Sequence, residues 1–221
     1  MAVSQKKMSM APCVELHPVN PQPRLVAQAV AVLRAGGLLV YPTDTCYALG
    51  CMIAAREAQE RLRRIRQLDA QHDFSLLFSS ISQMAEYAKL NDRAYALLRK
   101  ALPGPYTFIL PATKDVPRRL ADPRKRSIGV RIPDTPVCER LITDLGEPLM
   151  SSTLQLPGAD TPLTDPDEIC EALGGQVDMV LLSGVGGVRC STVVDLLEWP
   201  PRMLREGAGD LRSLGLGVVV P

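Results

Sequence analysis

Helical segments alternate with short apolar segments along most of this chain, and that alternation limits its possible folds more than any other feature. Residues 21–37, PQPRLVAQAVAVLRAGG, place apolar side chains at helical spacing and stop at Gly36-Gly37 before a short apolar strand at residues 38–42. Further helices are expected near residues 55–68, 81–88, 91–101, 135–145 and 166–173, and further strands at residues 74–78, 106–110, 127–133, 148–152, 177–183, 191–197 and 202–206. This order predicts an α/β architecture built in layers.

The strands of the last third follow one another with little room for crossover helices. We therefore expect one α/β domain whose twisted sheet mixes parallel and antiparallel pairs, with flanking helices and a basic concave surface. A chain of 221 residues is most simply one domain. We place it at residues 15–210, after a flexible lead-in of residues 1–14 and before a C-terminal tail of residues 211–221.

The formal net charge of +1 excludes binding to nucleic acid or acidic membranes through a global field, so any such binding needs a local patch. No run of about 18 apolar residues is present, and the N-terminus lacks the apolar core of a signal peptide. We expect no membrane partner and a cytoplasmic location. The sequence does not fix the oligomeric state.

The six cysteines form no C-x-x-C pair, and the chain has only two histidines. A structural zinc site is therefore not expected, and we identify no metal ligands among the protein side chains. Because nothing in the sequence indicates an oxidising compartment, we expect the cysteines to be free thiols.

The commonest nucleotide and hydrolase signatures, such as G-x-G-x-x-G, G-x-x-x-x-G-K-[ST] and G-x-S-x-G, are absent. The ends of the expected strands are instead rich in hydroxyls and guanidiniums. These junctions are YPTDTCYALG (41–50), RIRQLDAQH (64–72), SIGVRIP (127–133), LMSSTLQLPG (149–158), STVVDL (191–196) and LREGAG (204–209). Open α/β sheets bind ligands at such junctions, and arginine forks match phosphate or carboxylate, so an anionic ligand is expected.

The order of these junctions resembles the YrdC family over about residues 15–210. GGLLVYPTDTCYALG (36–50) is similar to the family segment Gly-Gly…Pro-Thr-Glu-Thr-x-Tyr-Gly-Leu-Gly, and LPGPYTFIL (102–110) to Trp-Pro-Gly-Pro-x-Thr. IRQLDAQHDFSLL, ATKDVPRRL, STLQLPG and REGAGD resemble the YciO branch of that family.

The resemblance implies synthesis of L-threonylcarbamoyladenylate from threonine, bicarbonate and ATP with Mg²⁺, for modification of an adenosine in tRNA. No covalent nucleophile and no tightly bound cofactor are implied. The residues implied for threonine are Thr45, Arg131, Thr153 and Ser191, and those for ATP are Arg66, His72, Ser127, Gln155, Thr164 and Arg205.

Two family motifs are altered in this chain. The synthases carry Lys-x-Arg-Pro where this sequence has Arg66-Gln67-Leu68-Asp69, and Ser-x-Asn where it has Thr153-Leu154-Gln155; a histidine that some synthases use near threonine aligns with Leu77. Losing one charged contact to a phosphate costs about 1.5–3 kcal/mol, or one to two decades in rate or affinity. We therefore expect an attenuated nucleotidyltransferase.

A second reading is a non-catalytic module that binds double-stranded RNA or tRNA. The segment PRRLADPRKR (117–126) carries Arg118, Arg119, Arg124, Lys125 and Arg126, and the low aromatic content of 4% favours contacts to backbone and duplex shape. Structural roles without any ligand also stay open: His72 as a neutral turn residue, and Arg61, Arg63 and Arg64 as a solvated helix face. Carbamoyl or adenylyl transfer to a different amine is a third possibility.

Overall fold

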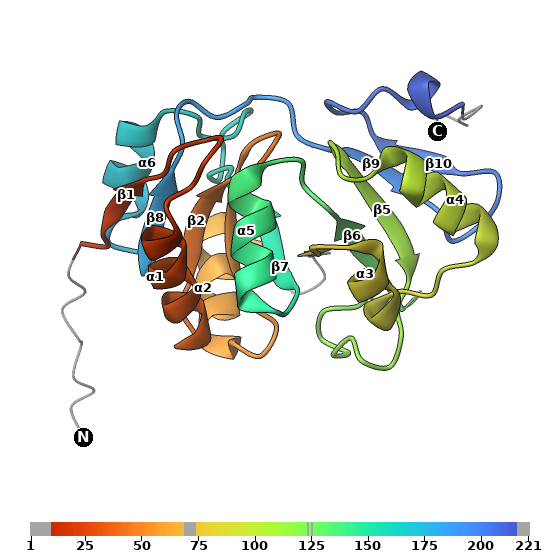
Figure 1. The fold of residues 1–221 in the computed structure, drawn as a ribbon, viewed down its shortest axis with the longest axis horizontal. Coiled ribbons are helices and arrows are strands. Elements are labelled where there is room, and N and C mark those ends of the chain that lie inside the picture. Colours follow the sequence, from red (N-terminus) through yellow and green to blue (C-terminus); the bar gives the residue numbers. More distant parts are fainter. Residues whose placement is uncertain (1–9, 69–73, 123, 125, 216–221) are drawn as a thin grey trace.

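The computed structural model describes residues 10–68, 74–122, 124 and 126–215, which form one sheet flanked by helices (Figure 1). The strands are β1 (Cys13–Glu15), β2 (Leu39–Pro42), β3 (Tyr47–Met52), β4 (Ser75–Leu77), β5 (Tyr106–Pro111), β6 (Ser127–Arg131), β7 (Leu149–Thr153), β8 (Met179–Leu182), β9 (Thr192–Asp195) and β10 (Arg202–Arg205). The helices are α1 (Pro23–Arg34), α2 (Arg56–Arg66), α3 (Ile81–Tyr87), α4 (Asp92–Ala101), α5 (Pro136–Leu145), α6 (Pro166–Leu173) and the 3-10 helix η1 (Leu211–Leu214).

The sheet is mixed, as the strand-rich last third of the sequence predicts. Its order over the described residues is β1-β8-β2-β3-β7-β4-β6-β5-β9-β10. Parallel pairs join β1 to β8, β8 to β2, β4 to β6 and β5 to β9, and the remaining neighbours are antiparallel. The prediction of a single α/β domain with a mixed sheet is confirmed.

Helices α1 and α5 pack side by side over one part of the sheet (Figure 1). Alternation in β2 shows how: Leu39 and Tyr41 join the cluster under α1 and α5, whereas Leu38 and Val40 join the larger cluster on the other face. The cluster under α1 and α5 takes side chains from β8, β2, β3, β7 and β4 but none from β6, β5 or β9 in the described residues. On this face of the sheet, the described residues of β6, β5 and β9 are therefore not covered by α1 and α5.

The local signals for helix ends act as expected. Asp165 caps α6, its Oδ1 accepting from the backbone N–H groups of Asp167 and Glu168 at 2.9 and 3.1 Å, with Pro166 in first position. Gly36 follows α1 at a φ of +83°, and a Cβ at Gly37 would lie 2.6 Å from Cγ1 of Val32. The Gly36-Gly37 pair thus fits both the left-handed turn and the tight start of β2.

Three elements were not among those expected. β1 crosses the boundary expected between the lead-in and the domain and pairs with β8, and η1 lies in the segment expected to be a tail, with Leu211 and Leu214 buried. β3 was not expected because residues 41–50 were assigned to a strand-to-loop junction; the loop occupies only the residues between β2 and β3.

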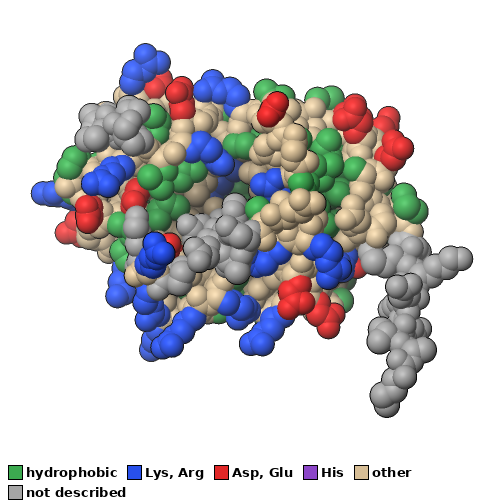
Figure 2. All heavy atoms as spheres, turned by 180° about the vertical axis from the view of Figure 1, so that it is seen from behind, with side chains coloured by type: hydrophobic (Ala, Val, Ile, Leu, Met, Phe, Trp, Pro, Cys, Tyr) green, Lys and Arg blue, Asp and Glu red, His purple; other side chains and the backbone are tan. Residues whose placement is uncertain are grey.

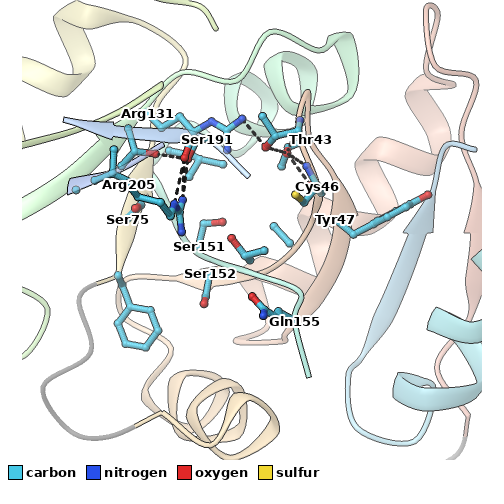
Figure 3. A pocket seen from close by; sticks show the side chains of 18 of the residues that line it. Thr43, Cys46, Tyr47, Ser75, Arg131, Ser151, Ser152, Gln155, Ser191 and Arg205 are labelled. Carbon is cyan, nitrogen blue, oxygen red and sulfur yellow. Dashed lines mark hydrogen bonds between the residues drawn. The ribbon is translucent and has the colours of Figure 1, made fainter. Parts of the chain in front are cut away.

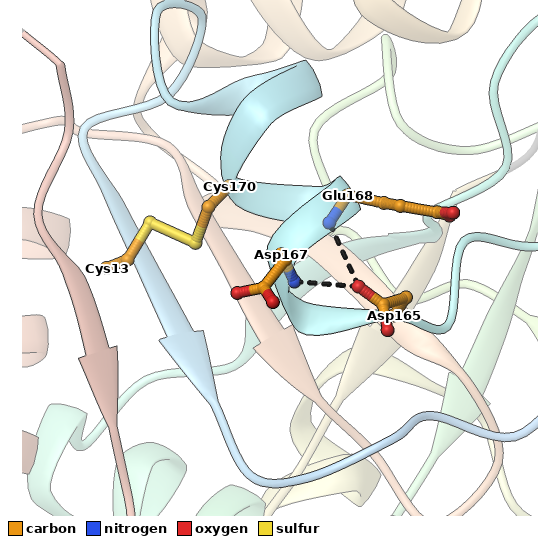
Figure 4. Close-up of a disulfide and its surroundings, with 5 residues drawn as sticks. All are labelled: Cys13, Asp165, Asp167, Glu168 and Cys170. Carbon is orange, nitrogen blue, oxygen red and sulfur yellow. Dashed lines mark hydrogen bonds between the residues drawn. A yellow bond between two sulfur atoms is a disulfide. The ribbon is translucent and has the colours of Figure 1, made fainter.

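The expectation of six free thiols is wrong for two of them. Cys13 on β1 and Cys170 on α6 form a disulfide, with their Cα atoms 6.3 Å apart and 157 residues between them in sequence (Figure 4). The pair was not predictable because it depends on β1 adding to the edge of β8, next to α6. Within the described residues, no helix is both long enough and apolar enough to span a bilayer.

Candidate functional site

A polar pocket of about 240 Å³ lies over five neighbouring strands of the sheet (Figure 3). Alternate residues of these strands face it, because side chains on a strand repeat every two residues. The lining pairs are Ser151 and Thr153 on β7, Ser75 and Leu77 on β4, Gly129 and Arg131 on β6, Thr107 and Ile109 on β5, and Ser191 and Val193 at β9.

Small side chains make the hollow. Ser75 lies opposite both Ser151 and Gly129 in the ladders, so three small residues are adjacent across β7, β4 and β6. A Cβ at Gly129 would lie 2.8 Å from Oγ of Ser75, so this position leaves no room for a larger side chain without movement. In the view of Figure 2 the surface is hollowed near its centre, and Lys and Arg side chains lie in and around the hollow.

Arg131 projects from the end of β6 toward the turn between β2 and β3. Its Nη2 donates to Oγ1 of Thr45 at 2.9 Å and forms an ion pair with Oδ1 of Asp44. The side chains of Arg131 and Asp44 are 9% and 10% exposed. Nε of Arg131 and Oδ2 of Asp44 are buried without a hydrogen-bond partner among the described residues, so this site retains one buried donor and one buried acceptor.

The turn itself is held by Thr43. Its Oγ1 accepts from the backbone N–H groups of Thr45 and Cys46, both at 3.2 Å, and donates to the Cys46 carbonyl at 2.7 Å. This local network fixes Thr45 opposite Arg131 without using the arginine.

Ser191 and Arg205 form the wall contributed by β9 and β10. Arg205 donates from Nη2 to the carbonyl and hydroxyl oxygens of Ser191 at 3.0 and 3.3 Å, and the Ser191 hydroxyl lies 2.8 Å from Oγ1 of Thr107. A positive charge from the end of β10 and two hydroxyls, one on β5 and one just before β9, therefore face the pocket.

A third guanidinium comes from the end of α2. Arg66 lines the pocket, its Nε has no partner among the described residues, and burial lowers the pKa of its guanidinium. Its neighbours on α2 have other roles: Arg61 pairs with Asp178 at 2.8 Å, and Arg63 stacks 4.5 Å over the Phe74 ring. Leu68, two residues beyond Arg66, packs against the core.

Seven of the ten residues expected for threonine and ATP line the pocket: Thr45, Arg66, Arg131, Thr153, Gln155, Ser191 and Arg205. Gln155 turns its amide back to donate to the Ala159 carbonyl at 2.7 Å. Ser127 and Thr164 are not among the lining residues: Ser127 is buried at the far end of β6, and the Thr164 carbonyl accepts from Gly186. His72 and Asp69 lie outside the described residues.

Asp44, Thr107, Ser151 and Ser152 are polar pocket or near-pocket residues that sequence reasoning did not single out, as are Cys46 and Cys190. The available signal was small polar residues at alternate positions of strands that are otherwise apolar. No group of three or more His, Cys, Asp or Glu side chains that could hold a metal ion occurs in the described ranges.

The basic segment 117–126 is only partly free to bind a partner. Arg118, Arg124 and Arg126 are exposed, but Arg119 donates to Oε1 of Gln59 at 3.2 Å and to the Ile53 carbonyl at 2.6 Å, which ties the segment to α2. Lys125 lies outside the described residues.

Comparisons with known proteins agree with this geometry. A family model, Sua5_yciO_yrdC, described as "Telomere recombination", matches residues 31–207. The uncharacterized protein YciO of Escherichia coli K12 is 45% identical over 197 residues, which are 89% of this chain and 96% of that protein. Its crystal structure superposes with a TM-score of 0.89 at 43% identity, covering 93% of this chain and all of that chain (100%).

The chain is also similar, at lower sequence identity, to threonylcarbamoyl-AMP synthases. The threonylcarbamoyl-AMP synthase of Pyrococcus abyssi is 28% identical over 188 residues, 84% of this chain and 55% of that protein. The crystal structure of P. abyssi Sua5 complexed with L-threonine shares the fold, with a TM-score of 0.85 at 24% identity over 95% of this chain and 62% of that one. From the family match and the similarity to YciO, this chain belongs to the Sua5/YciO/YrdC family.

Proposed function

We propose that this protein is a slow L-threonylcarbamoyladenylate synthase that uses threonine, bicarbonate and ATP. The observation that carries the proposal is the Arg131 site, where a buried guanidinium with an unpartnered Nε lies beside the Thr45 hydroxyl and near Ser191 in one pocket. An arginine fork of this kind suits a carboxylate, and hydroxyls suit the rest of an amino acid. The name of the P. abyssi relative and the threonine in the P. abyssi Sua5 structure support the choice of threonine.

The chemistry needs alignment more than a reactive side chain. The threonine amine takes up CO₂ to give a carbamate, and a carbamate oxygen attacks the α-phosphorus of ATP, so that a P–O bond forms as the bond to pyrophosphate breaks. Arg66 and Arg205, at separate walls of the pocket, would neutralise charge on the phosphates. Mg²⁺ would enter with ATP.

The attenuation follows from the segment directly after α2. Leu68 packs against the core and supplies no charge at the place where the synthases carry a second cation, so one phosphate contact is missing. A Leu68→Arg, Asp69→Pro variant restores the Arg-Pro half of the family motif, with Arg66 in the place of its lysine. From about 1.5–3 kcal/mol for one charge-assisted contact, we expect about a 10- to 100-fold faster reaction.

The test is mass-spectrometric detection of threonylcarbamoyladenylate after incubation with ATP, Mg²⁺, bicarbonate and threonine. Wild type should give product, the restored variant more, and Arg131→Gln none. Arg24→Gln, an exposed arginine on α1, is the matched control and should behave as wild type. Absence of product from both wild type and the restored variant, together with no calorimetric binding of ATP or threonine, would refute the proposal.

A second candidate is binding of double-stranded RNA or tRNA. The observation that favours it is the exposure of Arg118, Arg124 and Arg126 on one segment, and Figure 2 shows Lys and Arg side chains gathered along one edge of the molecule. Changing these three arginines to glutamate should weaken binding and flatten its salt dependence. Arg119 is left unchanged because it anchors the segment. Equal affinity of the variant and wild type would count against RNA binding at this segment.

A further inference from the structure

Two free thiols meet in the wall of the pocket. Sγ of Cys46 lies 3.5 Å from Sγ of Cys190, although the two residues are 144 positions apart in sequence. Cys46 is in the turn that carries Thr45, and Cys190 directly precedes Ser191 (Figure 3 labels Cys46 and Ser191). The proposed synthase chemistry uses neither thiol.

The surroundings of this thiol pair favour a thiolate at Cys190. Cys46 donates its S–H to Cys190, and that hydrogen bond, with the positive charges of Arg205 and Arg131 and a hydrogen bond from Thr153, lowers the pKa of Cys190. The thiolate is the reactive form of cysteine.

The two other free thiols of the described residues are in a different environment. Cys51 and Cys138 are fully buried, and burial raises the pKa of each to about 12. They should be inert at neutral pH, which makes them internal controls.

We propose that Cys46 and Cys190 are an oxidation site at which a hydroperoxide forms a disulfide that reshapes the pocket. The Cys190 thiolate attacks one hydroperoxide oxygen, the O–O bond breaks, and the departing oxygen takes a proton from water, which leaves Cys190 as a sulfenic acid. The Cys46 sulfur then attacks that of Cys190; the S–O bond breaks and the hydroxide leaves as water with the Cys46 proton. Two thiols are oxidised and one hydroperoxide is reduced.

The bond would move the residues that line the pocket. An S–S bond is about 2.05 Å long, so the sulfur atoms must approach from their present 3.5 Å. Little slack is available, because the segment before Cys190 already touches the turn: a Cβ at Gly187 would lie 1.9 Å from the Thr45 carbonyl oxygen. The shift would act first on Thr45 and Ser191, which are the chain neighbours of the two cysteines.

The effect on ligands rests on the proposed function, since it assumes that Thr45 and Ser191 contact the amino acid. Loss of one ordinary hydrogen bond at each of the two residues would lower threonine affinity by about 30-fold. Formation of the disulfide does not depend on that assumption.

The experiment treats wild type, Cys46→Ser, Cys190→Ser and Cys138→Ser with hydrogen peroxide and maps cross-linked peptides by mass spectrometry. Cys138→Ser is the matched control, because Cys138 is a free thiol whose Sγ donates to the Pro42 carbonyl at 3.2 Å and not to another sulfur atom. A 46–190 cross-link should form in wild type and Cys138→Ser, while Cys46→Ser should stop at oxygen adducts of Cys190. Iodoacetamide at pH 6.5 should label Cys190 before Cys51 and Cys138.

Calorimetry with threonine and ATP on the reduced and oxidised wild type supplies the second readout, and dithiothreitol should reverse the loss of affinity. Absence of the 46–190 cross-link, or labelling of Cys190 no faster than of Cys138, overturns the oxidation site. A cross-link with unchanged affinity overturns its effect on the pocket. If reduced protein binds no ligand, the proposed function fails while the cross-link result still decides the oxidation site.

Discussion

Replacing Asp44 by asparagine tests the central electrostatic feature of the pocket. Asp44 and Arg131 form an ion pair whose side chains are only 10% and 9% exposed. Removing one charge of a buried pair costs about 3–5 kcal/mol, because the remaining charge stays desolvated. Asparagine can still accept from Arg131, so we expect the lower end, about 3 kcal/mol. At 2–4 °C per kcal/mol for a chain of this size, Tm should fall by about 6–12 °C.

Asp44→Asn should also raise the affinity of the pocket for an amino-acid carboxylate, and so increase the stabilisation that threonine provides. Under the proposed function, the threonine carboxylate would compete with Asp44 for the Arg131 guanidinium in wild type, and in Asp44→Asn it would restore the missing negative charge. A ligand at 100 times its Kd stabilises a protein by about 2.7 kcal/mol, and at a fixed ligand concentration a lower Kd gives a larger stabilisation. In scanning calorimetry at one fixed threonine concentration, we therefore expect threonine to raise the Tm of Asp44→Asn more than it raises the Tm of wild type.

Asp144→Asn is the matched control for this change. Asp144 pairs with Arg140 on the surface of α5, with side chains 28% and 48% exposed, and such a pair contributes about 0.3–0.5 kcal/mol. If Asp44→Asn destabilises no more than Asp144→Asn, the pair is effectively solvated and our reasoning is wrong. If threonine stabilises neither Asp44→Asn nor wild type, Arg131 does not hold the carboxylate.

Three further predictions concern the scaffold. Asp165→Ala removes the cap of α6 and should lower the free energy of unfolding by about 1 kcal/mol in urea titrations; no change would show that water replaces the cap. Gly37→Ala places a Cβ 2.6 Å from Val32 and should cost about 1–3 kcal/mol; a neutral result would mean that α1 shifts freely. Because burial raises the pKa of Cys138 to about 12, its thiol stays protonated in the folded state while it ionises in the unfolded state above the usual value of 9.0. Stability should therefore fall between pH 9 and 12, by about 1.4 kcal/mol per pH unit for this group, and less steeply in Cys138→Ser; equal slopes would exclude Cys138 as a cause.

Much of the fold was predictable because it depends on local patterns. α5 and α6 begin and end at or within one residue of the predicted bounds. These bounds were predictable because they depend on the amphipathic spacing within each helix and on the capping residues Thr135 and Asp165 directly before it. β3 and β1 were missed for opposite reasons. β3 follows β2 so closely that residues 41–50 were assigned to a loop at the end of β2, and β1 is a three-residue edge strand defined only by its pairing with β8.

The sequence identified several residues that line the pocket, but it did not predict which of these residues contact one another. Thr45, Arg131, Ser191 and Arg205 were identified and do line one pocket. That Arg131 would face Asp44, and that Cys46 would meet Cys190, depends on how the β2–β3 turn lies against β6 and β9, which no local pattern encodes. Ser127 and Thr164 were carried over from the family resemblance, and the described pocket does not include them.

The strand order also has a consequence for the chain while it is being synthesised. β5 lies between β6 and β9, so until β9 is synthesised, β5 presents an unpaired edge to the cell. Ser191 and Arg205, which complete the pocket wall, arrive with β9 and β10, after the lining residues that precede β9 in the sequence. Chains that end before β9 therefore expose a strand edge that can pair with another chain, at a stage when the pocket is not yet complete enough for a ligand to stabilise it.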